Sequence, residues 1–150
     1  LVEMGIAEDR IIYQPCPLLE SEIQDDPNSD IVAKIIEEFI NQSSDKISSN
    51  KKVFAGLCCT HYGYSFNQFD MNIKKKFGND AEVLNPNDRM VESILDLEEN
   101  GIKNPLLKIE VISKVEILHH EQIALTKILA DQAPKTNKAL YNYIRFPELF

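Results

Sequence analysis

The sequence predicts an α/β fold in which a parallel sheet lies between two layers of helices, giving three layers. Strand-like and helix-like segments alternate along the first two thirds of the chain, and that order favours right-handed crossovers between parallel strands. The stretch Val53–Cys59 contains no charged or polar residue that alternates with its apolar ones, as expected of a central strand covered on both faces. Gly78 and Gly101 each follow a helix-like segment, where glycine commonly ends a helix.

The chain opens with Leu rather than Met, and residues 1–5 resemble the end of a helix with Gly5 just beyond its last turn. We therefore expect the chain to be a fragment of a longer protein. The first strand is expected at Arg10–Gln14, because Pro15 and Pro17 directly after it cannot donate to a strand ladder.

A first amphipathic helix is expected from about Asp30, with Asn28 or Ser29 as its cap. Its spacing of apolar residues predicts one buried stripe. The stripe consists of Ile31, Ile35, Ile36, Phe39 and Ile40. The polar, serine-rich stretch Gln42–Lys52 lacks periodicity and is expected to be a surface loop.

Two further helices and a strand are predicted after the apolar strand. The second helix places Phe66, Phe69, Ile73 and Phe77 on one face. A short strand at Ala81–Leu84 and a helix at Asp88–Glu99 follow, with Asn87 as the cap of that helix. The expected buried face of the latter consists of Met90, Val91, Ile94 and Leu95.

The last third of the chain has a different pattern. Apolar and charged residues alternate along Leu107–Ile117, so this strand is expected to bury only one face. A helix around His120–Asp131 follows, and Pro134 then opens an aromatic tail. We expect residues 1–101 to form one lobe and residues 102–150 to form a separate strand, helix and tail.

The composition argues against several classes of partner. The net charge of −8 argues against nucleic-acid binding, because phosphate recognition needs clustered Lys and Arg. The basic cluster Lys74–Lys76 lies near the end of a predicted helix, where it complements the helix dipole. No apolar run is long enough to cross a bilayer, and no signal sequence opens the chain. A cytoplasmic protein without a membrane partner is therefore expected.

The cysteines indicate one thiol kept for chemistry. The chain has 3 cysteines, two of them adjacent at Cys58 and Cys59, which fits a reducing compartment better than a disulfide framework. Strand alternation sends these two side chains to opposite faces, and His61 shares the direction of Cys59 if the extended geometry continues. Backbone N–H groups at the start of the next helix would favour a Cys59 thiolate, and His61 can exchange a proton with it.

Simpler readings of the same residues stay open. Adjacent cysteines in an apolar strand are usually small packing residues, and a single histidine after a strand is usually part of the surface or the scaffold. Metal binding by Cys58, Cys59 and His61 is disfavoured, because adjacent cysteines on opposite faces cannot easily share one tetrahedral ion. We interpret Cys16 as packing near the strand end, and His119 with His120 as solvated surface. Tyr62 and Tyr64 fit packing or a pocket wall.

One segment resembles a known family. Phe54–Tyr62 reads Phe-Ala-Gly-Leu-Cys-Cys-Thr-His-Tyr, which resembles the glutamate racemase signature, an apolar strand leading into Cys-Thr-His-Tyr. Upstream, Pro15–Leu19 is similar to the Cys-Pro-Leu segment of that family, and Asn85-Pro86 is similar to its next turn. The likeness runs in the same order from about Ile11 to Ile94 and is strongest in the Cys-Thr-His-Tyr core.

The resemblance implies a cofactor-independent amino-acid racemase with no metal, which interconverts L- and D-glutamate for peptidoglycan synthesis. Two cysteines on opposite sides of the substrate exchange its α-proton, and Cys59 matches the C-terminal one of the pair. Thr60 matches a substrate-binding position, and His61 matches the histidine that assists the cysteine and lies near the substrate. Residues 102–150 would return to an N-terminal lobe that carries the other cysteine. The chain alone is then expected to be inactive, and a homodimer is a further assembly to consider.

Departures from the family pattern keep alternatives open. The family has a Glu eight residues after the cysteine of its Cys-Pro-Leu segment, where it supports the histidine. This chain has Gln24 there, followed by Asp25, and either side chain is a candidate support for His61. Gly63 replaces the usual proline, and the N-terminal motifs of the family have no counterpart. An aspartate-type racemase and a catalytically silent paralogue acting as a binding or regulatory domain are the alternatives.

Overall fold

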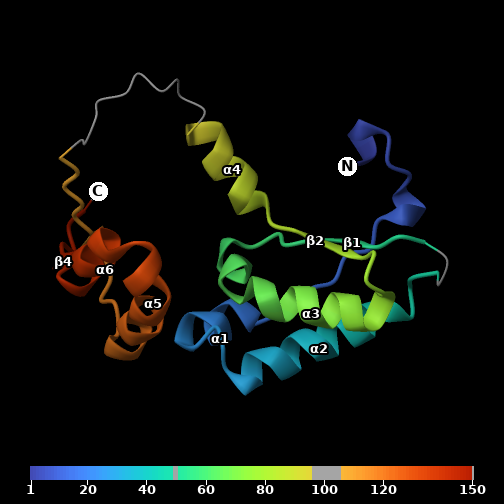
Figure 1. Cartoon of the computed structure of the whole chain (residues 1–150), viewed down its shortest axis with the longest axis horizontal. Helices are drawn as coiled ribbons and strands as arrows, with labels where there is room; N and C mark the ends of the chain where they lie inside the picture. Colours follow the sequence, from blue (N-terminus) through green and yellow to red (C-terminus); the bar gives the residue numbers. More distant parts are fainter. Residues whose placement is uncertain (49–50, 96–105, 150) are drawn as a thin grey trace.

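Helices and two small parallel sheets make up the part of the chain that the computed structural model describes, residues 1–48, 51–95 and 106–149 (Figure 1). The elements in chain order are η1 (Val2–Met4), η2 (Glu8–Arg10), α1 (Leu19–Asp25), α2 (Asp30–Ser44), β1 (Phe54–Gly56), η3 (Thr60–Ser65), α3 (Phe66–Phe77), β2 (Glu82–Leu84), α4 (Pro86–Leu95), β3 (Ile112–Ser113), α5 (His119–Gln132), α6 (Pro134–Tyr141) and β4 (Ile144–Arg145). The predicted mixture of helices with parallel strands is confirmed. None of the described helices has the length and apolarity needed to span a membrane.

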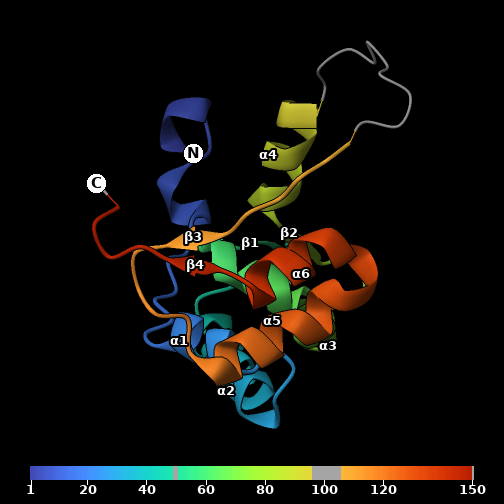
Figure 2. The same cartoon turned by 90° about the vertical axis from the view of Figure 1, so that its left-hand side faces the viewer.

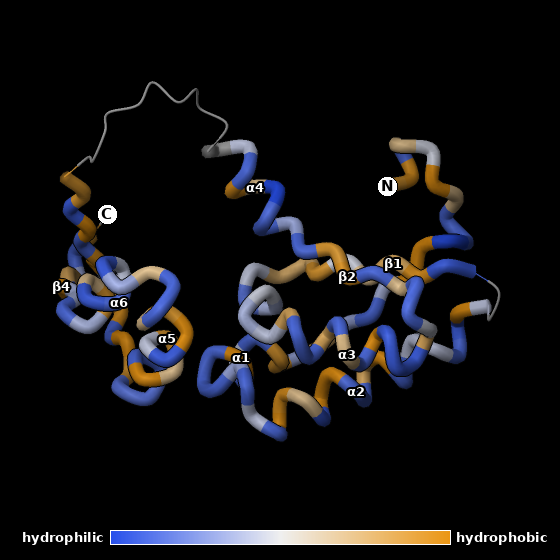
Figure 3. Tube along the Cα trace, in the orientation of Figure 1, coloured by the Kyte–Doolittle hydropathy of each residue, from blue (hydrophilic) through white to orange (hydrophobic). Residues whose placement is uncertain are grey.

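The first sheet positions the segment after β1, which carries Cys59 and His61. Strands β1 and β2 run parallel, with Ala55 paired to Val83, and α3 forms the crossover between them. Helices α2 and α3 lie on the same side of this pair in both views (Figures 1 and 2). The core between them is formed by Leu19, Ile23, Val32, Ile36, Ile40, Leu57, Phe69, Ile73 and Ala81. Figure 3 shows hydrophobic residues recurring along α2 and gathering along β1 and β2.

Only one face of this sheet is covered by the described helices. Phe54 and Leu84, at the two ends of the β1–β2 pair, remain 55% and 48% exposed. The apolar stretch Val53–Cys59 led us to expect cover on both faces, and in the described residues that expectation is wrong for Phe54 and Cys58. An unbroken apolar run indicates that a strand is suited to burial, but it does not show which helices cover each face of the sheet.

The sequence predicted the start of α2 and the end of α3 well. The Ser29 hydroxyl accepts a hydrogen bond from the Val32 N–H at 3.2 Å, so Ser29 is the cap of α2. Gly78 ends α3 with a positive φ of 100°, which glycine adopts without a Cβ clash, as its position after Phe77 predicts. The buried stripe of α2 is shifted, because Val32 is buried whereas Ile31 is 58% exposed. Helix α2 also runs to Ser44, into the predicted loop.

Two predicted elements differ at the start and middle of the chain. Residues 11–14 are irregular rather than a strand, since no neighbouring strand pairs with them in the described chain. Helix α4 begins at Pro86, a favoured first helical residue, so Asn87 lies inside the first turn and does not cap it. Met90 and Val91 are exposed because no described element covers that face. The side chains of Ile94 and Leu95, residues 96–99 and Gly101 lie outside the described residues.

The C-terminal part folds as a small unit of its own elements. Within the predicted strand Leu107–Ile117, only Ile112–Ser113 forms β3, which pairs in parallel with β4. Helix α5 was predicted to within one residue at each end, whereas α6 and β4 were missed. Pro134 opens α6 at its first position, where proline is favoured, rather than opening a tail. Helix α5 packs against both α6 and α1, which joins this unit to the first lobe.

The cap of α2 gives a direct test of local stability. Replacing Ser29 with Ala should lower the free energy of unfolding by about 1 kcal/mol, because the Val32 N–H loses its acceptor. Urea unfolding followed by circular dichroism measures the change. Asn28→Ala is the matched control and should cost much less, since Asn28 is not the cap. Equal losses in the two variants would contradict the assignment of Ser29.

Candidate functional site

Cys59 lies where the extended chain leaves β1. Pairing continues one residue past the strand, because the Leu57 N–H donates to the Leu84 carbonyl at 2.9 Å. Cys59 then takes extended backbone angles, φ −130° and ψ 137°, and immediately precedes η3. Its side chain is half-buried, whereas that of Cys58 is exposed. The sequence therefore predicted the position of Cys59 correctly, at the carboxyl edge of the parallel pair.

The thiol of Cys59 contacts an imidazole. The Cys59 sulfur lies 3.7 Å from Nδ1 of His61, with both side chains partly buried. The turn of η3 brings them together, since the Tyr62 N–H donates to the Cys59 carbonyl at 3.1 Å and folds the chain back. Depending on the tautomer of His61, either the thiol donates a hydrogen bond to Nδ1 or the Nδ1–H donates one to the sulfur. The two side chains meet through this turn, and not through the continued extended geometry that the sequence had suggested.

The turn after β2 supports the motif from a second strand. The Asn87 side-chain amide donates to the Thr60 carbonyl at 3.0 Å. Gly63 packs closely beside it, because a Cβ atom at this position would lie 3.3 Å from the side-chain nitrogens of both Asn85 and Asn87. Thr60 itself keeps an exposed side chain. Asn87 is thus a supporting residue that the sequence pattern misassigned as a helix cap, although Asn85-Pro86 had marked this turn.

Cys16 and Tyr62 form a partly buried floor close to Cys59. The Tyr62 hydroxyl donates to the Cys16 carbonyl at 3.4 Å, and its ring packs against Phe69 with centroids 5.5 Å apart. Burial raises the pKa of the Cys16 thiol, with an opposing effect of its hydrogen bond to Tyr62. Burial first, and then the neighbouring Cys16 and Cys59, raise the pKa of the Tyr62 hydroxyl strongly. Cys16 and Tyr62 therefore stay neutral near pH 7, as wall residues do.

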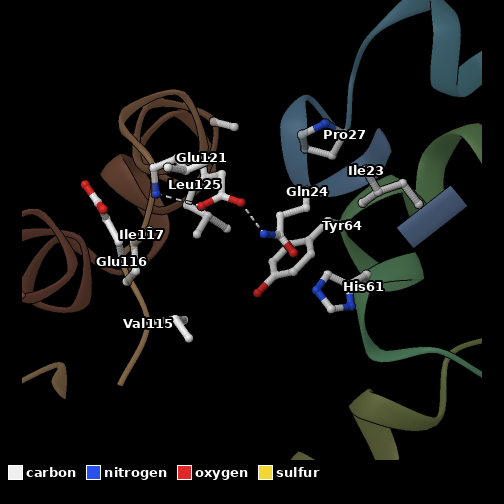
Figure 4. Close-up of a pocket in the computed structure, with 12 residues that line it drawn as sticks. Ile23, Gln24, Pro27, His61, Tyr64, Val115, Glu116, Ile117, Glu121 and Leu125 are labelled. Carbon is white, nitrogen blue, oxygen red and sulfur yellow. Dashed lines mark hydrogen bonds between the residues drawn. The ribbon is translucent and has the colours of Figure 1, made fainter. Parts of the chain in front are cut away.

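A cavity of about 500 Å³ opens beside His61. One wall comes from α1 and η3 and the other from α5 and the chain before it (Figure 4). The lining residues are Ile23, Gln24, Pro27, His61, Tyr64, Val115, Glu116, Ile117, Leu118, Glu121, Ala124 and Leu125. His61 is the member of the Cys-Thr-His motif that lines this cavity, whereas Cys59 is not among the lining residues.

Gln24 and Asp25 make contacts other than the expected ones. The Gln24 side-chain amide donates to a carboxylate oxygen of Glu121 across the cavity (Figure 4). An oxygen of Asp25 lies 2.9 Å from Nε2 of His120. Both residues thus contact the first turn of α5 rather than His61. His120, interpreted from the sequence as solvated surface, contacts α1 while remaining exposed.

Comparison with known proteins does not assign the chain to a family. No protein-family model, curated protein or solved structure matches the chain. The site is therefore defined by three features: the contact between Cys59 and His61, their place at the edge of a parallel sheet, and the adjoining cavity.

The raised pKa values of Cys16 and Tyr62 predict that the free energy of unfolding depends on pH. A raised pKa means that the folded chain holds the proton more tightly than the unfolded chain does. The resulting contribution to the free energy of unfolding is complete at neutral pH. It is lost as the pH rises past the ordinary pKa of 9.0 for cysteine and 10.0 for tyrosine, because the unfolded chain then releases its protons first. Between about pH 9 and pH 11, the free energy of unfolding should fall more steeply for the wild type than for Tyr62→Phe.

Urea unfolding at a series of pH values measures both slopes. Tyr13→Phe is the matched control, because Tyr13 is 78% exposed, and it should keep the slope of the wild type. A Tyr62→Phe protein with the same slope as the wild type would show that the Tyr62 hydroxyl does not hold its proton as described.

Proposed function

We propose that this chain is the C-terminal part of a cofactor-independent amino-acid racemase that interconverts L- and D-glutamate. The observation that carries the proposal is the 3.7 Å contact between the Cys59 sulfur and His61 Nδ1 at the carboxyl edge of a parallel sheet. This pair belongs to the Cys-Thr-His-Tyr segment that resembles the glutamate racemase signature. Ligands of open α/β sheets bind beyond this edge.

The chemistry needs a thiolate that can remove the α-proton of an amino acid. Transfer of the Cys59 proton to Nδ1 of a neutral His61 leaves a thiolate next to an imidazolium, an arrangement that stabilises the charged sulfur. The thiolate then takes the α-proton, and a second such group, in its protonated form, donates a proton to the opposite face of the planar carbanion and is left as the base. In this proposal the second base comes from the other lobe of the intact enzyme, so the 150-residue chain is inactive alone.

Neighbouring groups have the properties that such a site requires. Thr60 has an exposed side chain next to Cys59, within reach of a substrate carboxylate, and Asn87 holds its carbonyl in place. Tyr62 and Cys16 keep their protons and so add no competing negative charge near the thiolate. In this scheme Cys59 is the base, His61 is its proton partner and a ligand of the substrate, and Thr60 is a binding residue.

The uncovered face of the first sheet fits the three-layer architecture of the proposal. Phe54 and Leu84 expose large apolar side chains on the face opposite the core, because strand alternation directs their neighbours Ala55 and Val83 into it. In an intact three-layer lobe, further elements of the protein would cover these side chains. Burial of this face would stabilise the fold by about 25 cal/mol for each Å² of apolar surface removed from water.

One observation favours a second candidate, a catalytically silent domain that only binds a small molecule. The cavity is lined by His61 and Tyr64 but not by Cys59, and Glu121 engages the Gln24 amide. A ligand in that cavity would meet the His61 imidazole, apolar side chains and polar residues such as Glu121, without meeting the thiol. An aspartate-type racemase is a variant of the first proposal, motivated by Gln24 in place of the family glutamate.

Activity of the full-length protein separates these functions. Cys59→Ser should lower kcat for glutamate racemisation by about 100-fold or more, because a serine hydroxyl stays protonated at neutral pH and cannot replace the thiolate as the base. Cys58→Ser is the matched control and should stay close to the wild type, since Cys58 is exposed beside the motif. Chiral chromatography of the product from L-glutamate and, in parallel, from L-aspartate measures the rates.

The outcomes decide between the candidates. Turnover of aspartate alone would reassign the substrate. A wild-type protein that racemises neither acid, yet binds one of them, would replace the racemase proposal with the binding domain. Equal activity of Cys59→Ser and Cys58→Ser would contradict the role of Cys59.

A further inference from the structure

An imidazole and two carboxylates meet where α1 contacts α5. Asp25 is the last residue of α1, and His120 and Glu121 belong to the first turn of α5. Each offers one ligand atom, and these atoms all lie within 4.8 Å of one another. We propose that these three side chains bind a divalent transition-metal ion, with Zn²⁺ as the best fit, and that the ion clamps α5 to α1.

The distances require only small adjustments. Zn²⁺ binds imidazole nitrogen and carboxylate oxygen at about 2.0–2.2 Å, so its ligand atoms lie roughly 3.5 Å apart in a tetrahedral site. His120 Nε2 and Asp25 Oδ1 already lie 2.9 Å apart. Both side chains are more than half exposed, at 56% and 60%, and can rotate to admit the ion.

The local charges favour a cation. Asp25 and Glu121 bring two carboxylates close together, and a divalent ion removes their mutual repulsion. Glu121 accepts hydrogen bonds from the Leu118 N–H at 2.8 Å and from the Gln24 amide, both neutral donors that leave its charge in place. A carboxylate has about four acceptor positions, so Glu121 can keep these bonds and still bind a metal. The carbonyl end of α1 at Asp25 also favours a cation.

The donor set selects the class of metal. One imidazole with two carboxylates suits Zn²⁺ and its neighbours in the first transition row, whereas Ca²⁺ and Mg²⁺ prefer oxygen ligands alone. Three protein ligands leave a fourth position for water. Gln24 and Glu121 also line the cavity beside His61, so the ion would fix one rim of that cavity (Figure 4).

The three ligand residues are separate from the residues of the proposed racemase chemistry. Neither Cys59 nor His61 belongs to the cluster, and the ligands come from segments 95 residues apart in sequence. A bound ion would therefore act as a cross-link between α1 and the C-terminal unit. Its removal should loosen the cavity without touching the thiol–imidazole pair.

Zn²⁺ titration of the metal-free 150-residue chain tests the site. Isothermal titration calorimetry should show one ion per chain, and the ion should raise the melting temperature. His120→Ala and Asp25→Asn should each weaken binding about tenfold or more, and Asp25→Asn keeps the side-chain size if His120→Ala folds poorly. His119→Ala is the matched control, because its neighbour His120 carries the ligand atom, and it should bind as the wild type does.

Co²⁺ substitution identifies the ligand atoms. Binding through Asp25, His120 and Glu121 predicts visible bands of Co²⁺ without the intense near-ultraviolet thiolate band, and no effect of a Cys58→Ser/Cys59→Ser protein. Absence of stoichiometric binding would overturn the proposal. So would a thiolate band, loss of binding in the double cysteine variant, or equal weakening by His119→Ala and His120→Ala.

Discussion

The parallel pairing of β1 with β2 is the constraint on which the rest of the structure depends. Because α3 connects the two strands as a crossover, their carboxyl ends lie at the same edge of the sheet. The segment after β1 carries Cys59 and His61, and the turn after β2 carries Asn85 and Asn87. The bond from Asn87 to the Thr60 carbonyl and the close packing at Gly63 then join the two turns. Burial of the apolar face on α2 and α3 holds this edge in place.

The second determinant is the contact between α1 and α5. It encloses the cavity beside His61 and draws Gln24 and Asp25 away from the role that the family resemblance implied for that position. The proposed chemistry at Cys59 and the proposed binding in the cavity therefore share one residue, since His61 contacts the thiol and lines the cavity. The approach of a ligand to the His61 imidazole decides whether Cys59 acts as a base or whether the chain only binds the ligand.

Local signals in the sequence were sufficient for some features and insufficient for others. Ser29, Gly78 and the place of Cys59 were predictable, because a cap, a glycine stop and a strand end are set by a few adjacent residues. The partner of Gln24 was not, since Glu121 lies 97 residues away and nothing in either segment encodes the pairing. The exposed face at Phe54 was also missed, because periodicity reports how apolar a strand is and not which layer covers it.

The most direct measurement is the alkylation rate of Cys59 with iodoacetamide at neutral pH, followed by peptide mass spectrometry, in the wild type and in His61→Ala. Because the imidazole contacts the sulfur, its loss should slow the reaction of Cys59 several-fold while leaving Cys58 unchanged as the internal reference. Equal rates at Cys59 in the two proteins would show that the thiol and the imidazole do not act as a pair, and the proposed chemistry would fail.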